Sequence, residues 1–121
     1  NYSIPEAIKR ASKFQFDAVE LHWPYDQDPD GIREHSRNLG MDIIAINTPR
    51  GDFGRGEFGL AAVPGREVEA RRHIETSLSY ANRIGAQHVH VDAENQRAYI
   101  RYGAAGGGRT EVVHSQFHVS V

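Results

Sequence analysis

Polar side chains that follow apolar runs are the first candidates for contact with a ligand. Glu20 and Asn47 each end such a run, and Arg50 follows shortly after Asn47. Glu20 could orient a substrate hydroxyl or accept hydrogen bonds from nearby amides. The amide of Asn47 could bind a substrate or hold the backbone of the loop that follows, and we favour the role of holding the loop. The planar guanidinium of Arg50 could pair with a carboxylate, while a solvated loop cation is at least as common.

His88 and His90 form a second group of candidates. They share one face of a predicted strand, because side chains alternate along a strand. His90 lies nearer the carboxyl end, where ligand sites form in α/β proteins, so we expect it to be a hydrogen-bonding imidazole in a pocket. The pair could also ligate a metal ion, but two ligands alone do not make a site.

The segment 47–66 connects a predicted strand to a predicted helix. Its glycines and prolines indicate a shaped connector, and it is much longer than the usual loop of about 2–6 residues. Loops that follow the carboxyl end of a strand bind ligands in α/β proteins. We therefore expect this loop to lie over the strand ends and to form part of a substrate pocket. The cluster Trp23-Pro24-Tyr25 could form an aromatic lip there, although packing against the next helix is more common.

The elements that position these residues alternate regularly along the first part of the chain. Helical patterns cover residues 4–14, 28–39 and 66–84. Strand patterns cover residues 16–21, 42–46 and 87–91. Such alternation is typical of parallel βα units with helices on the outer side of the sheet.

From residue 92 the pattern changes. Residues 92–102 could be helical, but they follow a strand with no turn residues between, and a glycine run at 106–108 interrupts the chain. Residues 111–114 and 117–121 have strand patterns. We expect one partial domain over 1–121, with continuous βα units in 1–91 and shortened or discontinuous pieces after it. The expected breaks lie after Val91 and near Gly106.

Several segments together resemble the hydroxypyruvate isomerase family over residues 1–91. They are Phe16-Asp17-Ala18-Val19-Glu20 with Pro24-Tyr25, Ile46-Asn47-Thr48, Gly51-Asp52, Gly56-Glu57-Phe58-Gly59-Leu60, Pro64-Gly65-Arg66-Glu67 and His88-Val89-His90-Val91. The resemblance implies a (β/α)8 TIM barrel of the xylose-isomerase type, present here as an incomplete set of βα units. It also implies interconversion of hydroxypyruvate and tartronate semialdehyde through an enediol.

The resemblance carries expectations about the site. The catalytic glutamates of the family belong to later strands, so no catalytic residue can be named in this chain. His114 stands about where the first of these glutamates is expected. A divalent cation, Mg²⁺ or Mn²⁺, would polarise the substrate oxygens, with ligands that are not in this chain. Glu20, Asn47, Arg50 and His90 remain the candidates for contact with a small 2-oxo or 2-hydroxy acid.

The composition excludes some classes of partner and leaves rival functions open. A net charge of −2 without a basic stripe argues against nucleic acid, and no apolar run reaches the roughly 20 residues that span a bilayer. We expect a cytoplasmic protein without disulfides, because the chain has no cysteine. The alternatives are a 2-oxo-tetronate isomerase or sugar epimerase on the same barrel, and a non-catalytic α/β fragment that assembles with another chain, for instance as a homo-oligomer. An endonuclease on this barrel would need more metal ligands and a more basic surface.

Overall fold

The computed structural model describes residues 2–93, 98–101, 110–113 and 116–120. The α-helices are α1 (Ile4–Lys13), α2 (Pro29–Asn38) and α3 (Glu67–Ile84), and a short 3-10 helix, η1, covers Phe53–Arg55. The strands are β1 (Ala18–Leu21), β2 (Asp42–Asn47), β3 (His88–Asp92), β4 (Ala98–Arg101), β5 (Thr110–Val113) and β6 (Gln116–Ser120). The alternation of helix and strand predicted for residues 1–91 is confirmed.

The helices begin and end at residues with recognisable capping chemistry. Ser3 and Glu6 form a capping box on α1, in which the Ser3 amide donates to Glu6 Oε2 at 3.0 Å. Asp28 caps α2 by accepting from the Gly31 amide at 2.8 Å. Gly85 ends α3 with a φ of 80°, a left-handed conformation that residues with a side chain rarely adopt. These local signals explain why the helices lie close to where the sequence predicts them.

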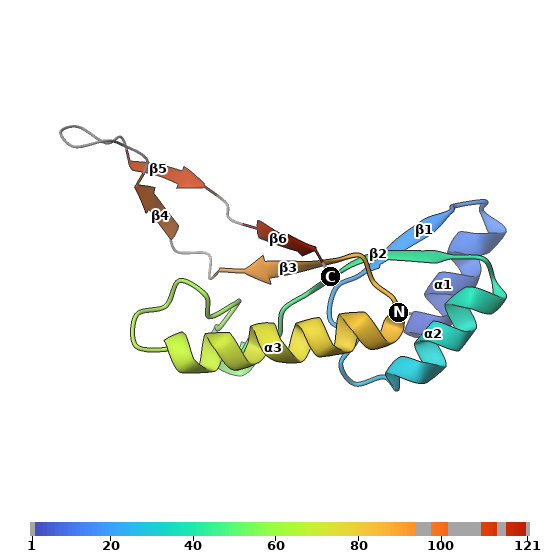
Figure 1. Cartoon of the computed structure of the whole chain (residues 1–121), viewed down its shortest axis with the longest axis horizontal. Coiled ribbons are helices and arrows are strands. Elements are labelled where there is room, and N and C mark those ends of the chain that lie inside the picture. Colours follow the sequence, from blue (N-terminus) through green and yellow to red (C-terminus); the bar gives the residue numbers. More distant parts are fainter. Residues whose placement is uncertain (1, 94–97, 102–109, 114–115, 121) are drawn as a thin grey trace.

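Strands β1, β2 and β3 form a parallel sheet in that order, as predicted. In the register, Glu20 lies beside Ala45 and Ala45 beside His88, while Asn47 lies beside His90. The three helices pack against these strands, and α3 runs beneath β3 (Figure 1). Because the strands are parallel, their carboxyl ends meet at one edge of the sheet, which is where the segment between β2 and α3 lies (Figure 1).

The chain departs from a regular barrel after β3. Strand β6 pairs antiparallel with β3, and β4 pairs antiparallel with β5 in a separate two-stranded sheet. The helix expected over residues 92–102 is wrong where that segment is described, since Asp92 belongs to β3 and Ala98–Arg101 is a strand. A parallel return to the sheet needs a long crossover, usually a helix, whereas a short return pairs antiparallel.

The later strands predicted from the sequence are confirmed as β5 and β6 within the described residues. Strand β3 runs through Val91 and Asp92 without interruption, while the break expected near Gly106 and the position of His114 lie outside the described residues. The division of the domain at residue 91 stays a prediction.

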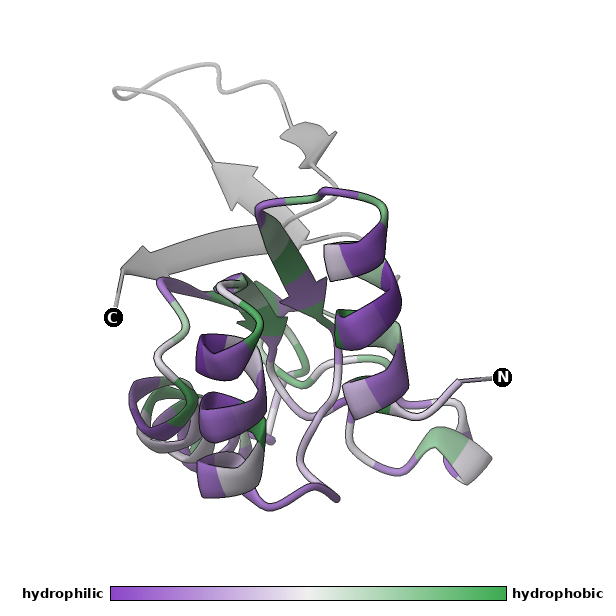
Figure 2. Cartoon of the chain, turned by 90° about the vertical axis from the view of Figure 1, so that its right-hand side faces the viewer, coloured by the Kyte–Doolittle hydropathy of each residue, from purple (hydrophilic) through white to green (hydrophobic). Residues whose placement is uncertain are grey.

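The hydrophobic core lies between the parallel sheet and the helices. It includes Ile8 of α1, Ile46 of β2, Ala81 of α3 and Val89 of β3, all of which are fully buried. Figure 2 shows the most apolar residues in the strands and the polar ones along the outer turns of the helices. Full burial of one isoleucine stabilises a fold by about 1.5–3 kcal/mol, so this layer fixes the strands that carry the site.

Candidate functional site

Polar side chains are buried at the carboxyl ends of β2 and β3. Val89 packs in the core, so His90 and Asp92 project from the opposite face of β3, because side chains alternate along a strand. Asn47 contacts the side chain of Asp92 and therefore shares that face. The exposed fractions are 6% for Asn47, 6% for His90 and 7% for Asp92. This edge of a parallel sheet is where α/β proteins bind ligands.

Within this group, the side chain of Asn47 binds the side chain of Asp92. Asn47 Nδ2 donates to Asp92 Oδ1 at 3.1 Å and to Asp92 Oδ2 at 3.0 Å. The side chain of Asn47 thus binds a carboxylate on the next strand rather than the loop backbone, which was the role favoured from the sequence. A hydrogen bond to a charged acceptor is worth about 1.5–3 kcal/mol, so the contact strongly links β2 to β3.

Thr48 joins the same two strands just beyond the end of β2. Its backbone amide donates to the carbonyl of His90 at 2.8 Å, and its hydroxyl accepts from the amide of Asp92 at 3.0 Å. Thr48 is 3% exposed, so these bonds form away from water. The backbone on both sides of the buried polar group is therefore held in place.

Tyr25 fastens this group to α3. Its hydroxyl contacts the carbonyl of Asn47, and it donates to Ser77 Oγ at 2.8 Å, while Ser77 donates to the carbonyl of His73 at 2.6 Å. Burial raises the pKa of Tyr25 to about 12, and the charge of Asp92 adds to that effect. The phenol is therefore a neutral, structural donor around neutral pH.

Arg50 lies in an aromatic cluster at the start of the long loop. Its guanidinium carbon is 4.0 Å from the ring centre of Trp23, 4.5 Å from that of Phe53 and 5.6 Å from that of Phe58. Cation–π contacts hold a guanidinium by its face and leave the N–H donors at its edge for a planar anion. Among the described residues, no carboxylate forms an ion pair with Arg50.

The aromatic cluster also decides between the two roles considered for Trp23-Pro24-Tyr25. Trp23 packs edge-to-face on Phe58, with ring centres 5.8 Å apart, and so belongs to the loop. Tyr25 packs on Tyr80 of α3, with ring centres 5.2 Å apart. Trp23 thus packs with the loop, as expected for the aromatic lip, whereas Tyr25 packs against a helix.

The long loop is seated on the end of β3 at Gly59. The Gly59 amide donates to the carbonyl of Arg50 at 2.8 Å, and Leu60 forms an antiparallel bridge with Ala93. Gly59 has a φ of 106°, and a Cβ there would lie 2.2 Å from the carbonyl oxygen of Asp92. The geometric part of the prediction for this loop is thus confirmed, since it lies over the carboxyl end of the sheet.

Glu57 closes the other side of the loop. Its Oε2 accepts from the Asp52 amide at 2.6 Å, and its Oε1 pairs with Arg66 Nη1 at 2.6 Å. Arg66 also pairs with Glu69 in the first turn of α3 at 2.7 Å. The bond from Arg66, followed by the one from the Asp52 amide, holds the pKa of Glu57 below its ordinary value. The loop is thus tied to the start of α3.

The other sequence candidates lie one row lower in the sheet. Glu20 is beside Ala45, and Ala45 is beside His88, two residues nearer the amino end than Asn47 and His90. Glu20 is exposed, and no described residue forms an ion pair with it. The structure therefore brings Asn47 and His90 together, sets Glu20 below them and places Arg50 in the loop.

Asp92 is the site residue that the sequence analysis did not select. Its signal was present, because His88, His90 and Asp92 alternate with valines and must share one face of the strand. The helical pattern of residues 92–102 instead predicts the start of a helix at this position. Among the described residues, no group of three or more His, Asp or Glu is placed to hold a metal ion.

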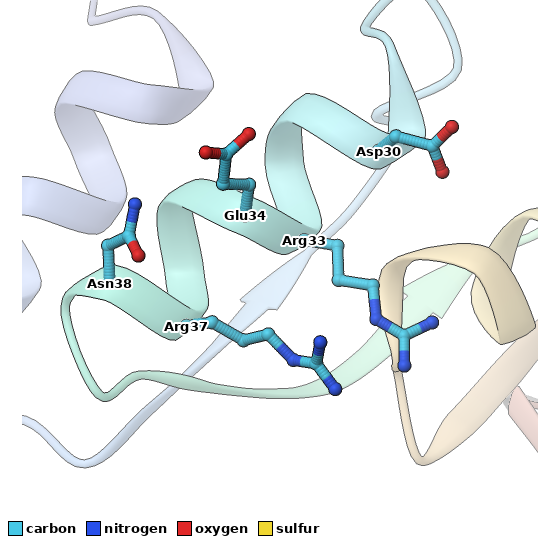
Figure 3. A pocket seen from close by; sticks show the side chains of 5 residues that line it. All are labelled: Asp30, Arg33, Glu34, Arg37 and Asn38. Carbon is cyan, nitrogen blue, oxygen red and sulfur yellow. The ribbon is translucent and has the colours of Figure 1, made fainter.

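A separate hollow of about 370 Å³ lies on the outer surface of α2 and is lined by Asp30, Arg33, Glu34, Arg37 and Asn38 (Figure 3). Arg33 donates to the carbonyl of Arg83 at 3.1 Å, and Asp30 pairs with Arg83 at 2.8 Å. These contacts join α2 to α3. Helix packing therefore accounts for Asp30 and Arg33 in this hollow.

Comparison with known proteins places these features in a family. A sequence profile described as the xylose isomerase-like TIM barrel matches residues 8–114. A protein of Mus musculus that is provisionally named hydroxypyruvate isomerase is 38% identical over 90 residues, which are 74% of this chain and 32% of that protein. The 2-oxo-tetronate isomerase of Haemophilus influenzae is 36% identical over 86 residues, which are 71% of this chain and 33% of that protein.

A solved structure shows the same arrangement of elements. The crystal structure of an AP endonuclease, family 2, from Brucella melitensis has a TM-score of 0.72 and 32% identity, covering 76% of this chain and 36% of that chain. The chain thus spans about a third of the length of these relatives. No helix within the described residues has the length and apolar character needed to cross a membrane.

Proposed function

Since the chain belongs to the xylose isomerase-like TIM barrel family, we propose that the protein isomerises a small hydroxy-oxo acid. The proposed reaction interconverts hydroxypyruvate and tartronate semialdehyde by moving a proton between adjacent carbons through an enediol. Relatives named as hydroxypyruvate isomerase and 2-oxo-tetronate isomerase support this class of reaction. Because the chain spans about a third of their length, the groups that move the proton are proposed to lie on strands outside it.

The observation that carries the proposal is the placement of Arg50. Its guanidinium is held by the rings of Trp23 and Phe53, so its edge donors can bind a planar carboxylate in two parallel hydrogen bonds. Hydroxypyruvate and 2-oxo-tetronate both carry a carboxylate, whereas a neutral sugar does not. Arg50 is therefore proposed to select acids.

The remaining candidates take supporting roles in this proposal. His90 is a hydrogen-bonding imidazole for a substrate oxygen, at the level of the sheet where Asn47 lies beside it. Asn47 contacts a substrate oxygen with the free side of its amide. Glu20, one row lower, orients a substrate hydroxyl or another group of the pocket. A ligand held by these residues would lie beneath the loop that Gly59 seats.

A divalent cation, Mg²⁺ or Mn²⁺, belongs to the proposal as the group that would polarise the substrate oxygens. The described residues offer no group of three metal ligands, so no step is assigned to it within this chain. A cytoplasmic location and a homo-oligomer also stay predictions.

Four alternatives differ in what they require. A 2-oxo-tetronate isomerase would use the same Arg50 contact, while a sugar epimerase would leave it without a role. An endonuclease, suggested by the name of the Brucella melitensis protein, fits poorly with a net charge of −2. A non-catalytic fragment that assembles with another chain would need no ligand at all.

The test is turnover measured by ¹³C NMR on the purified protein, with and without Mg²⁺ or Mn²⁺. Hydroxypyruvate, a 2-oxo-tetronate and a neutral ketose are offered separately. The proposal expects isomerisation of at least one acid and none of the ketose. Turnover of the ketose alone would favour an epimerase, and no turnover of either acid would leave the non-catalytic fragment.

A further inference from the structure

We infer that Asp92 is a positioning residue that fixes the direction of the Asn47 amide, so that Asn47 presents a hydrogen-bond acceptor to a hydroxyl group of the substrate. This inference deepens the proposed function and rests on it, since it names the chemical group that the same pocket recognises. Its starting observation is that both carboxylate oxygens of Asp92 accept from Asn47 Nδ2, at 3.1 and 3.0 Å.

The amide can bind Asp92 in one direction only. A carboxylate is an acceptor at both oxygens, and an amide has a donor end and an acceptor end. If the amide were reversed, its oxygen would stand about 3 Å from both oxygens of an anion, in a site where water cannot screen the repulsion. The buried carboxylate therefore holds the nitrogen toward β3 and turns Asn47 Oδ1 the other way.

The backbone of Asn47 is held by hydrogen bonds, so the direction of its side-chain amide is what Asp92 can set. The backbone amide of Asn47 donates to the carbonyl of His22 at 2.9 Å, and its carbonyl is bound by the hydroxyl of Tyr25. The residue is 6% exposed and lies at the end of a paired strand. Without Asp92 the two ends of its amide would be nearly equivalent, and Asn47 could offer a donor or an acceptor.

The fixed direction has a consequence for recognition. Asn47 Oδ1 accepts from no described residue, and as an acceptor it can bind a hydroxyl but not a carbonyl or a carboxylate. A site built to bind a hydroxyl rejects an analogue that lacks it, because the acceptor is then left without a partner. Pyruvate differs from hydroxypyruvate only by that hydroxyl, and both carry the carboxylate proposed for Arg50.

The experiment measures the dissociation constants of hydroxypyruvate and pyruvate by calorimetry and compares their ratio among variants of the full chain. Binding does not require turnover, so the result is independent of catalysis. Asp92→Leu and Asn47→Ala each remove the pair. The exchanged pair Asn47→Asp with Asp92→Asn restores a donor facing an acceptor and still turns an oxygen toward the ligand. Thr48→Val is the structural control, because it loses the bond to the Asp92 amide but keeps the pair.

We expect hydroxypyruvate to bind about three to ten times more tightly than pyruvate, which corresponds to the free energy of one hydrogen bond. This ratio should hold in the wild type, in Thr48→Val and in the exchanged pair. We expect a ratio near one in Asp92→Leu and Asn47→Ala. If Asp92→Leu folds and keeps the wild-type ratio of dissociation constants, the inference is overturned. If Asp92→Leu does not fold, the exchanged pair decides, and a ratio near one in that variant would overturn the inference. A wild type that prefers hydroxypyruvate but does not turn it over would sink the proposed function alone. A wild type that binds neither acid would contradict both.

Discussion

Gly59 lies against the backbone carbonyl of Asp92, so closely that a Cβ at position 59 would stand 2.2 Å from that oxygen. The backbone of Gly59 is also left-handed, with a φ of 106°. The contact seats the long loop on the end of β3, beside the aromatic cluster that holds Arg50.

Gly59→Ala should destabilise the fold and displace the loop. The substitution adds both a strained φ and a clash with backbone, whereas Gly65→Ala adds only the strain, because Gly65 has a φ of 81° and nothing within 4 Å of its Cβ position. Strain at a left-handed residue costs about 1–2 kcal/mol, so Gly59→Ala should lose clearly more than that in urea unfolding. Equal losses in the two variants would mean that the seat at Asp92 does not matter.

Arg50→Ala should raise the KM for hydroxypyruvate by about tenfold to a hundredfold, as expected for loss of a charged hydrogen-bonded contact. Arg50→Lys should recover little of this, because an ammonium group cannot form the planar paired contact. Arg55→Ala, an exposed arginine of the same loop, is the control in steady-state kinetics. A KM unchanged in Arg50→Ala would remove Arg50 from the substrate site.

The bond between Glu57 and Arg66 should open in acid. The folded pKa of Glu57 lies below its ordinary value of 4.5, so its contribution to stability is full above pH 4.5 and is lost as the pH falls through the folded value. Trp23 is the single tryptophan and touches Phe58, so its fluorescence reports on the loop. The wild type should show a change in Trp23 fluorescence below pH 4.5, and Glu57→Gln should not. Glu6→Gln, which alters only the cap of α1, should behave like the wild type. The same transition in all three proteins would contradict the assignment.

Tyr25→Phe should cost about 1–3 kcal/mol, because Ser77 Oγ loses a buried donor and the carbonyl of Asn47 loses its contact with the phenol oxygen. The raised pKa of about 12 means that this phenol stabilises the fold fully below pH 10 and that the effect disappears as the pH rises through 12. Urea unfolding at pH 7 and absorbance titration at 295 nm measure the two effects. Tyr2→Phe, at a tyrosine that is 62% exposed, is the control and should leave the stability unchanged.

The sequence predicts the parts of this structure that depend on local chemistry. The capping residues Ser3 and Asp28, the glycine stop at Gly85 and the alternation of apolar residues fix the helices and parallel strands. The position of the long loop over the strand ends also follows from its place after β2. These features are set by a few neighbouring residues, which a sequence displays directly.

The features that the sequence did not predict depend on contacts between distant residues. Residues 92–102 have a helical pattern, but Asp92 is held in β3 by pairing with β6 and by Asn47, which lies 45 positions earlier. The sequence leaves the role of Arg50 open, since only the folded chain brings Trp23 and Phe58 next to its guanidinium. Pairing across the sheet and the closing of a loop are tertiary effects that override local propensity.

The central claim is that the carboxyl ends of β2 and β3 form the substrate pocket, and the most direct test is steady-state kinetics of His90→Ala on hydroxypyruvate. The account predicts that kcat/KM falls by about tenfold to a thousandfold while the circular dichroism spectrum shows that the variant still folds. His35→Ala is the matched control, because His35 binds the carbonyl of Pro5 between α1 and α2, and it should keep its kcat/KM. Full activity in a folded His90→Ala would contradict the claim.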